Sequence, residues 1–124
     1  LRPYPPPSLA IFQGVFAVTT AADLSKSRVV IVVIGMKGCG ACEEYIPRFQ
    51  RIAARYAHCL PVRVLDASTP EGAQVADRFR VEATPTTLIL RKPHGQVHYE
   101  GALDDAEIEG VFALAARGLS CELE

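Results

Sequence analysis

The chain has 124 residues, enough for one domain with a buried core. Hydrophobic residues make up 49%, charged residues 22%, and the formal net charge is −1, so no overall field favours nucleic acid or anionic lipid. No apolar run approaches the roughly 20 residues of a membrane helix. We therefore expect neither nucleic-acid binding nor a membrane span.

The N-terminal part predicts an arm followed by the first elements of a sheet. Residues 1–8 contain four prolines and are expected to form an extended arm or linker. Ile11 to Thr19 fits a first strand, and Thr20 to Lys26 a short helix or turn. The β-branched run Val29 to Ile34 predicts a central strand covered on both faces.

The middle of the chain alternates between helical and strand patterns. Apolar residues at spacings of three and four predict a helix from Ala41 to Tyr56, which Pro47 should kink. Pro61 to Leu65 predicts another strand. Thr69, as a cap before a proline, predicts a helix that runs to about Phe79.

The C-terminal part predicts a hairpin and a last helix. Thr86 to Leu90 and Gln96 to Tyr99 read as paired strands, and Asp104 as the cap of a helix that Gly118 ends. Strands that alternate with helices imply a sheet with helices on both faces. The final hairpin adds an antiparallel pair, so the sheet should be mixed. The predicted organisation is an arm (1–8), one domain (9–119) and a tail (120–124).

A Cys39-Gly40-Ala41-Cys42 motif lies between the buried strand and the helix start. The positive end of a helix dipole favours thiolate, the reactive form of cysteine. Cys39 is therefore expected to be the exposed nucleophile, and Cys42, one turn later, the buried thiol that resolves the mixed disulfide. Gly40 and Ala41 are small and let the two sulfurs approach.

A zinc half-site is the alternative interpretation of this motif. A tetrahedral zinc site needs four ligands, which usually come from two such pairs. The chain has no second pair, and the remaining candidates, His58, Cys59, His94 and His98, show no matching spacing. We therefore predict a redox pair with no metal or other cofactor, and three surface histidines.

Three segments resemble thioredoxin. Val29 to Tyr56 resembles its strand, CxxC motif and kinked helix, with Pro47 as the kinking proline. Val81 to Thr86 resembles the segment that carries the family's cis-proline, and Glu100 to Leu103 the glycine turn before the last helix. The resemblance covers residues 11–118. It implies an α/β thioredoxin fold, with a central mixed sheet of about five strands flanked by about four helices.

The resemblance also implies a function and a site. It implies a thiol–disulfide oxidoreductase, active in electron transport and cell redox homeostasis, that exchanges electrons with protein disulfides or dithiols and with an upstream donor or acceptor protein. The catalytic pair would be Cys39 and Cys42, in a monomer, with Pro85 cis beside them. The expected substrate-binding residues are Gly38, Gly40, Ala41, Thr84, Pro85 and Gly101.

Four positions depart from the family's pattern. Its usual Trp, Pro, buried Asp and partner Lys are replaced here by Gly38, Ala41, Val33 and Val64. Losing both members of a buried ion pair together is physically coherent, because one charge left alone would cost several kcal/mol. In the family that acid is thought to move the proton of the resolving thiol, so water, Glu43 or Lys37 would have to replace it. We therefore expect weaker general reductase activity, or fewer partners.

The other two cysteines allow two interpretations. Cys59 by itself is typical of a small buried hydrophobic residue. In the resembled fold, however, the second and last helices end at the same pole of the molecule. Cys59 and Cys121 lie just past those ends, which makes a structural disulfide between them a hypothesis. Such a disulfide would favour an oxidising compartment.

Several questions stay open at the level of sequence. One alternative function is a non-catalytic docking module with the same fold. Another is an exported, anchored reductase or oxidase, with residues 1–8 as its linker. The chain begins at Leu1 rather than Met, so we expect that upstream residues were removed, and both a cytoplasmic and a periplasmic location remain possible. The motif does not reveal the direction of electron flow, because reduction and oxidation use the same residues.

Overall fold

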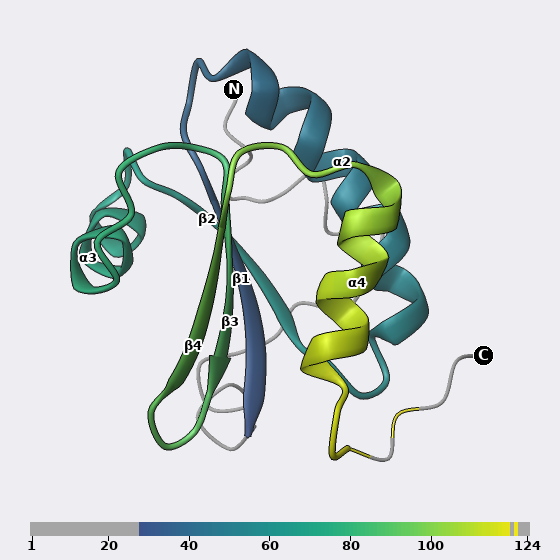
Figure 1. Ribbon diagram of the computed structural model, residues 1–124. Coiled ribbons are helices and arrows are strands. Elements are labelled where there is room, and N and C mark those ends of the chain that lie inside the picture. Colours follow the sequence, from purple (N-terminus) through teal and green to yellow (C-terminus); the bar gives the residue numbers. More distant parts are fainter. Residues whose placement is uncertain (1–27, 120, 122–124) are drawn as a thin grey trace.

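A mixed four-stranded sheet forms the centre of the computed structural model, which describes residues 28–119 and residue 121 (Figure 1). The strand order is β2-β1-β3-β4, with β1 parallel to β2 and antiparallel to β3, and β3 antiparallel to β4. The strands are β1 (Val29–Gly35), β2 (Val62–Asp66), β3 (Thr86–Arg91) and β4 (Gly95–Glu100). The strand predicted for residues 11–19 and the helix or turn at 20–26 lie outside the described residues.

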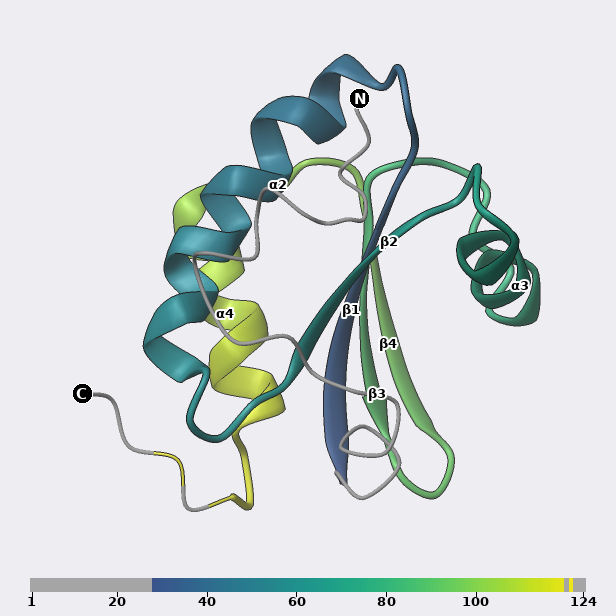
Figure 2. The same cartoon turned by 180° about the vertical axis from the view of Figure 1, so that it is seen from behind.

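Helices cover both faces of the sheet, as the alternating pattern predicted. The helices are α2 (Gly40–Ala53), the short 3-10 helix η3 (Ala54–Tyr56), α3 (Pro70–Arg78) and α4 (Asp105–Ala115). Figures 1 and 2 show α2 and α4 together on one face and α3 on the other. The described part of the chain thus holds four strands and three α-helices, compared with the five and four predicted for the whole chain.

The buried strand β1 divides the core into two clusters. Ile31 and Val33 belong to the cluster beneath α2 and α4, whereas Val32 and Ile34 belong to the smaller one beneath α3. All four side chains are almost fully inaccessible to solvent. A run in which every residue is apolar is what a strand with two covered faces requires.

Side-chain caps fix where the helices begin. Thr69 Oγ1 accepts a hydrogen bond from the backbone N–H of Gly72 at 3.1 Å, and Asp104 forms a reciprocal capping box with Glu107. Both caps were predicted. The predicted helix to Tyr56 is α-helical only as far as Ala53 and continues as η3.

Aromatic rings pack α2 against α4. The Phe49 and Phe112 ring centroids lie 5.3 Å apart, and the Tyr56 ring stacks on Phe112 at 4.5 Å. Pro47 lies inside α2, where it cannot donate a backbone hydrogen bond, and the helix changes direction along its length (Figure 2). The packing holds the start of α2 at the carboxyl end of β1, where the candidate site lies.

Candidate redox site

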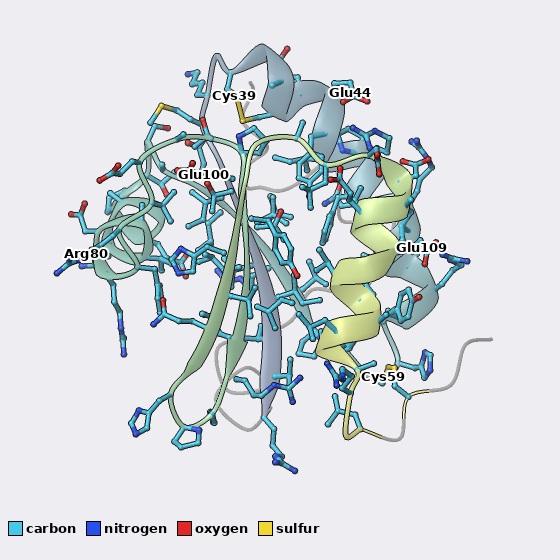
Figure 3. All side chains as sticks on the ribbon, viewed as in Figure 1. Cys39, Glu44, Cys59, Arg80, Glu100 and Glu109 are labelled. Carbon is cyan, nitrogen blue, oxygen red and sulfur yellow. A yellow bond between two sulfur atoms is a disulfide. The ribbon has the colours of Figure 1, made fainter. Side chains whose placement is uncertain are left out.

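A disulfide between Cys39 and Cys42 occupies the first turn of α2 (Figure 3). Their Cα atoms are 5.2 Å apart. Cys39 is the N-cap residue of α2, and its Sγ accepts a hydrogen bond from the backbone N–H of Cys42 at 3.1 Å. Cys39 is partly exposed, whereas Cys42 is 0% exposed. The pair therefore has one sulfur within reach of a partner and one beneath the surface.

The turn before the disulfide depends on Gly38. Its φ is +85°, a left-handed conformation that side-chain-bearing residues rarely adopt. The turn is closed by a hydrogen bond from the Cys39 N–H to the Met36 carbonyl at 3.1 Å. Gly38, Gly40 and Ala41 are all exposed. These three positions thus add almost no side-chain bulk next to the accessible sulfur.

Two further loops meet the disulfide. The Thr84–Pro85 peptide bond is cis, as predicted. The Thr84 carbonyl oxygen lies 3.7 Å from Cys39 Sγ. The Gly101 N–H donates to the Pro85 carbonyl at 2.8 Å, and Gly101 itself has a φ of +89°. The structure therefore brings together Thr84, Pro85 and Gly101, which are far apart from the cysteines in sequence.

Cys42 belongs to a buried cluster that consists largely of apolar side chains. Val33 and Val64 are direct partners in the parallel pairing of β1 and β2. Val33 is 0% exposed and shares a buried cluster with Cys42, and Val64 packs against that cluster. The two alternative proton donors or acceptors, Lys37 and Glu43, are exposed.

A pair of hydroxyl groups is buried near this cluster and was not predicted from the sequence. Tyr45 Oη and Thr87 Oγ1 lie 2.8 Å apart, and both residues are fully buried. Thr87 is the β3 partner of Val33. Burial raises the pKa of Tyr45 from 10 to about 12, so its hydroxyl keeps its proton at an alkaline pH where an exposed tyrosine loses it. The signal in the sequence was a tyrosine and a threonine at otherwise apolar positions, but only the fold pairs them.

Tyr45→Phe is expected to destabilise the protein by about 1–3 kcal/mol, because the buried Thr87 hydroxyl loses its partner. The free energy of unfolding in urea measures this loss. A raised pKa also means that native Tyr45 keeps its proton when the unfolded chain loses it, so wild-type stability should fall as pH rises from 10 toward 12. Tyr45→Phe should remove that part of the pH dependence. Tyr56→Phe is the matched control, and an equal effect on stability from both variants would contradict the assignment.

One residue beside the motif was also missed. Met36 is 41% exposed, although most large apolar side chains among the described residues are covered. It lies three residues before Cys39, on the turn that leads into the disulfide. An exposed apolar side chain at such a place can add contact area for a bound polypeptide.

A second disulfide lies at the other end of the domain. It joins Cys59, just after η3, to Cys121, beyond α4, with Cα atoms 5.6 Å apart. Both residues are partly buried. The pairing agrees with the hypothesis drawn from the resemblance. His94 and His98 are exposed, as predicted, and His58, also exposed, adjoins this disulfide.

The fold and the buried and exposed sulfurs define a protein of the thioredoxin-like class, and comparisons identify the family. A model of the thioredoxin family matches residues 16–113. The chain belongs to the thioredoxin family. None of the helices in the described residues has the length and apolar character needed to cross a bilayer.

Curated relatives match part of the chain. It is 40% identical over 73 residues to protein disulfide-isomerase A4 of Bos taurus. This match covers 56% of this chain and 11% of that protein. It is 28% identical over 65 residues to the chloroplastic thioredoxin Y of Oryza sativa subsp. japonica, covering 52% of this chain and 38% of that one. The chain therefore spans less than half the length of these relatives.

Solved structures share the fold at low sequence identity. The germline-specific thioredoxin Deadhead of Drosophila melanogaster aligns with a TM-score of 0.64 at 21% identity, covering 78% of this chain and 95% of that one. The thioredoxin of Fasciola hepatica aligns with a TM-score of 0.63 at 22% identity and the same coverage. These structures support the thioredoxin fold.

Proposed function

We propose that the chain exchanges electrons with disulfides of protein substrates through Cys39 and Cys42. The observation that carries this proposal is the asymmetry of the pair. Cys39 is partly exposed at the start of α2 and accepts a backbone N–H hydrogen bond on its sulfur, whereas Cys42 is completely buried. A hydrogen-bond donor and the positive end of a helix both stabilise a thiolate at the accessible position.

The exchange takes place in two substitutions at sulfur. The Cys39 thiolate attacks one sulfur of the substrate disulfide, forms a mixed disulfide and releases the other substrate sulfur as a thiolate. Cys42, as a thiolate, then attacks Cys39 Sγ and releases the second substrate sulfur. Two electrons pass from the protein dithiol to the substrate, and the Cys39–Cys42 disulfide remains. A dithiol donor must reduce that disulfide before the next turnover, and the reverse sequence oxidises a substrate dithiol.

The backbone around the disulfide suits a polypeptide substrate. The Thr84 carbonyl is directed to Cys39, and Gly101 is held beside Pro85 by its N–H. Backbone groups recognise an extended chain by strand-like hydrogen bonds that depend little on its sequence. Gly38, Gly40 and Ala41 leave room for that chain to approach the sulfur. We propose that Thr84 and Gly101 hold substrate, and that exposed Met36 adds an apolar contact.

Insulin reduction with dithiothreitol as electron donor tests the proposal. We expect the chain to catalyse the reaction above the rate with dithiothreitol alone, but more slowly than a thioredoxin that retains the buried Asp and Lys. The reason is that Val33 and Val64, in and against the cluster that contains Cys42, offer no group to move its proton. The absence of any catalysis would contradict the proposed function. A turnover equal to that of the comparison thioredoxin would contradict the role given to the two valines.

A further inference from the structure

Three side chains with metal-binding atoms meet at the end of the domain opposite Cys39. They are His58, Cys59 and Cys121, and their ligand atoms all lie within 4.8 Å of one another. His58 and Cys59 lie in the connection between η3 and β2, and Cys121 follows the turn after α4. Figure 3 shows Cys59 and Cys39 at opposite ends of the molecule. Within residues 28–119 and 121, no other group of three such residues is this compact.

The chemistry of this group suits zinc. Imidazole nitrogen and thiolate sulfur bind zinc at about 2.0–2.3 Å in a tetrahedron, so the ligands of one ion lie within about 4 Å of each other. The observed separations, all within 4.8 Å, are close to that spacing once the two sulfurs are no longer bonded to each other. His58 is exposed, so its ring can turn without unpacking the core. Cys59 is held by its backbone, whose N–H donates to the Tyr56 carbonyl at 3.0 Å.

The two sulfurs are joined as a disulfide, and this state excludes a metal. A zinc ligand must be a thiolate, and neither sulfur is one while the disulfide is intact. The Cα atoms of Cys59 and Cys121 are 5.6 Å apart, so both sulfurs can stay close to one point after reduction. Disulfide and zinc would therefore be alternative ways of joining the same two segments.

We propose that His58, Cys59 and Cys121 bind one zinc ion when their disulfide is reduced. A dithiol reductant gives two electrons and two protons to the disulfide, and is itself oxidised to a disulfide. Zinc then displaces the thiol protons and binds two thiolates and the neutral imidazole, with water in the fourth position. A disulfide oxidant reverses the step: it takes two electrons from the two thiolates by thiol–disulfide exchange and is reduced to a dithiol, the Cys59–Cys121 disulfide reforms, and the ion is released.

This arrangement would keep Cys59 and Cys121 linked in both redox states. Cys59 and Cys121 are 62 residues apart in sequence, and a link between them restricts the unfolded chain. A zinc ion bound to the same residues would replace that link under reducing conditions. The site is remote from Cys39 and Cys42. Zinc binding at His58, Cys59 and Cys121 therefore does not depend on the proposed exchange reaction.

Zinc titration of the full chain carrying Cys39→Ser and Cys42→Ser tests the proposal, because the redox pair can then no longer bind the ion. The protein is reduced with a phosphine, desalted without oxygen and titrated with zinc against a chromophoric chelator. We expect one zinc per reduced chain and none per oxidised chain. Cobalt in place of zinc should give the intense visible bands of tetrahedral thiolate coordination.

Two histidine variants decide whether the binding uses the proposed site. Loss of an outer partner of a metal ligand already weakens binding 10- to 100-fold, so His58→Ala should weaken it by more than about 100-fold. His94→Ala, an exposed histidine on the β3–β4 hairpin, should leave the affinity unchanged. Circular dichroism of the oxidised variants checks that each one folds. No zinc on the reduced protein, or equal affinity in the two histidine variants, would overturn the proposal.

Discussion

Cys39→Ser is expected to reduce insulin turnover to the rate of dithiothreitol alone. A serine hydroxyl ionises far less readily than a thiol and cannot form a disulfide, so neither the attack nor the mixed disulfide is possible. Cys39 is partly exposed at the N-cap of α2, and oxygen can still accept the hydrogen bond from the Cys42 N–H. The variant should therefore fold, and its circular dichroism should match that of the wild type.

The matched control removes the other two sulfurs. A variant with both Cys59→Ser and Cys121→Ser loses the second disulfide, which lies at the far end of the domain. It should keep the turnover of the wild type at a temperature where it remains folded, although its free energy of unfolding should fall by about 2–4 kcal/mol. Retained turnover in Cys39→Ser, or lost turnover in the folded control, would place the reactive thiol elsewhere.

Restoring a buried acid should accelerate the exchange. Val33→Asp combined with Val64→Lys places an acid and a base at partnered positions of β1 and β2, in the cluster that contains Cys42. Positioned proton transfer contributes about 10²–10⁴-fold in enzymes, so even an imperfectly placed carboxylate should raise turnover at neutral pH by about tenfold or more. The wild-type rate should climb with pH because the Cys42 thiol, buried among apolar side chains, must ionise by itself. The turnover rate of the double variant should depend less on pH than that of the wild type.

The control for this prediction changes one atom. Val33→Asn combined with Val64→Lys has nearly the same shape but cannot take up a proton at that position. Both variants place polar groups in the core and should lower the free energy of unfolding by several kcal/mol, so urea denaturation must show that they are folded at the assay temperature. Equal turnover and equal pH profiles in the Asp and Asn variants would contradict a proton-transfer role.

The fold was predictable where local pattern and position agree. The apolar run at Val29 to Ile34 predicted a strand covered on both faces, and β1 has that position. Thr69 and Asp104 predicted helix starts because their side chains cap free N–H groups, which is a local interaction. The end of the helix at Ala53 was less predictable, because a 3-10 turn continues the same apolar face to Tyr56.

The site was predictable only in part for a physical reason. The spacing of Cys39 and Cys42 and the glycine turn could be read along the chain. The contacts of Cys39 with Thr84, and of Pro85 with Gly101, join distant segments and are visible only in the fold. Of this arrangement, the resemblance to thioredoxin implied that a cis Pro85 lies beside the cysteines. His58 was expected to be an unremarkable surface residue, because no spacing rule relates it to Cys121. Its place beside Cys121 arises only when η3 and α4 end at the same pole.

Trapping of the mixed disulfide tests the central claim most directly. Cys42→Ser, reduced at the active site and mixed with a protein disulfide, should stop after the first substitution, because no thiol remains to attack Cys39 Sγ. Digestion followed by mass spectrometry should then find the substrate joined to Cys39. The reverse variant, Cys39→Ser, should give almost no adduct, since Cys42 is 0% exposed. With Cys42→Ser, an adduct at Cys59 or Cys121, or no adduct at all, would contradict the account. With Cys39→Ser, abundant adduct at Cys42 would contradict it as well.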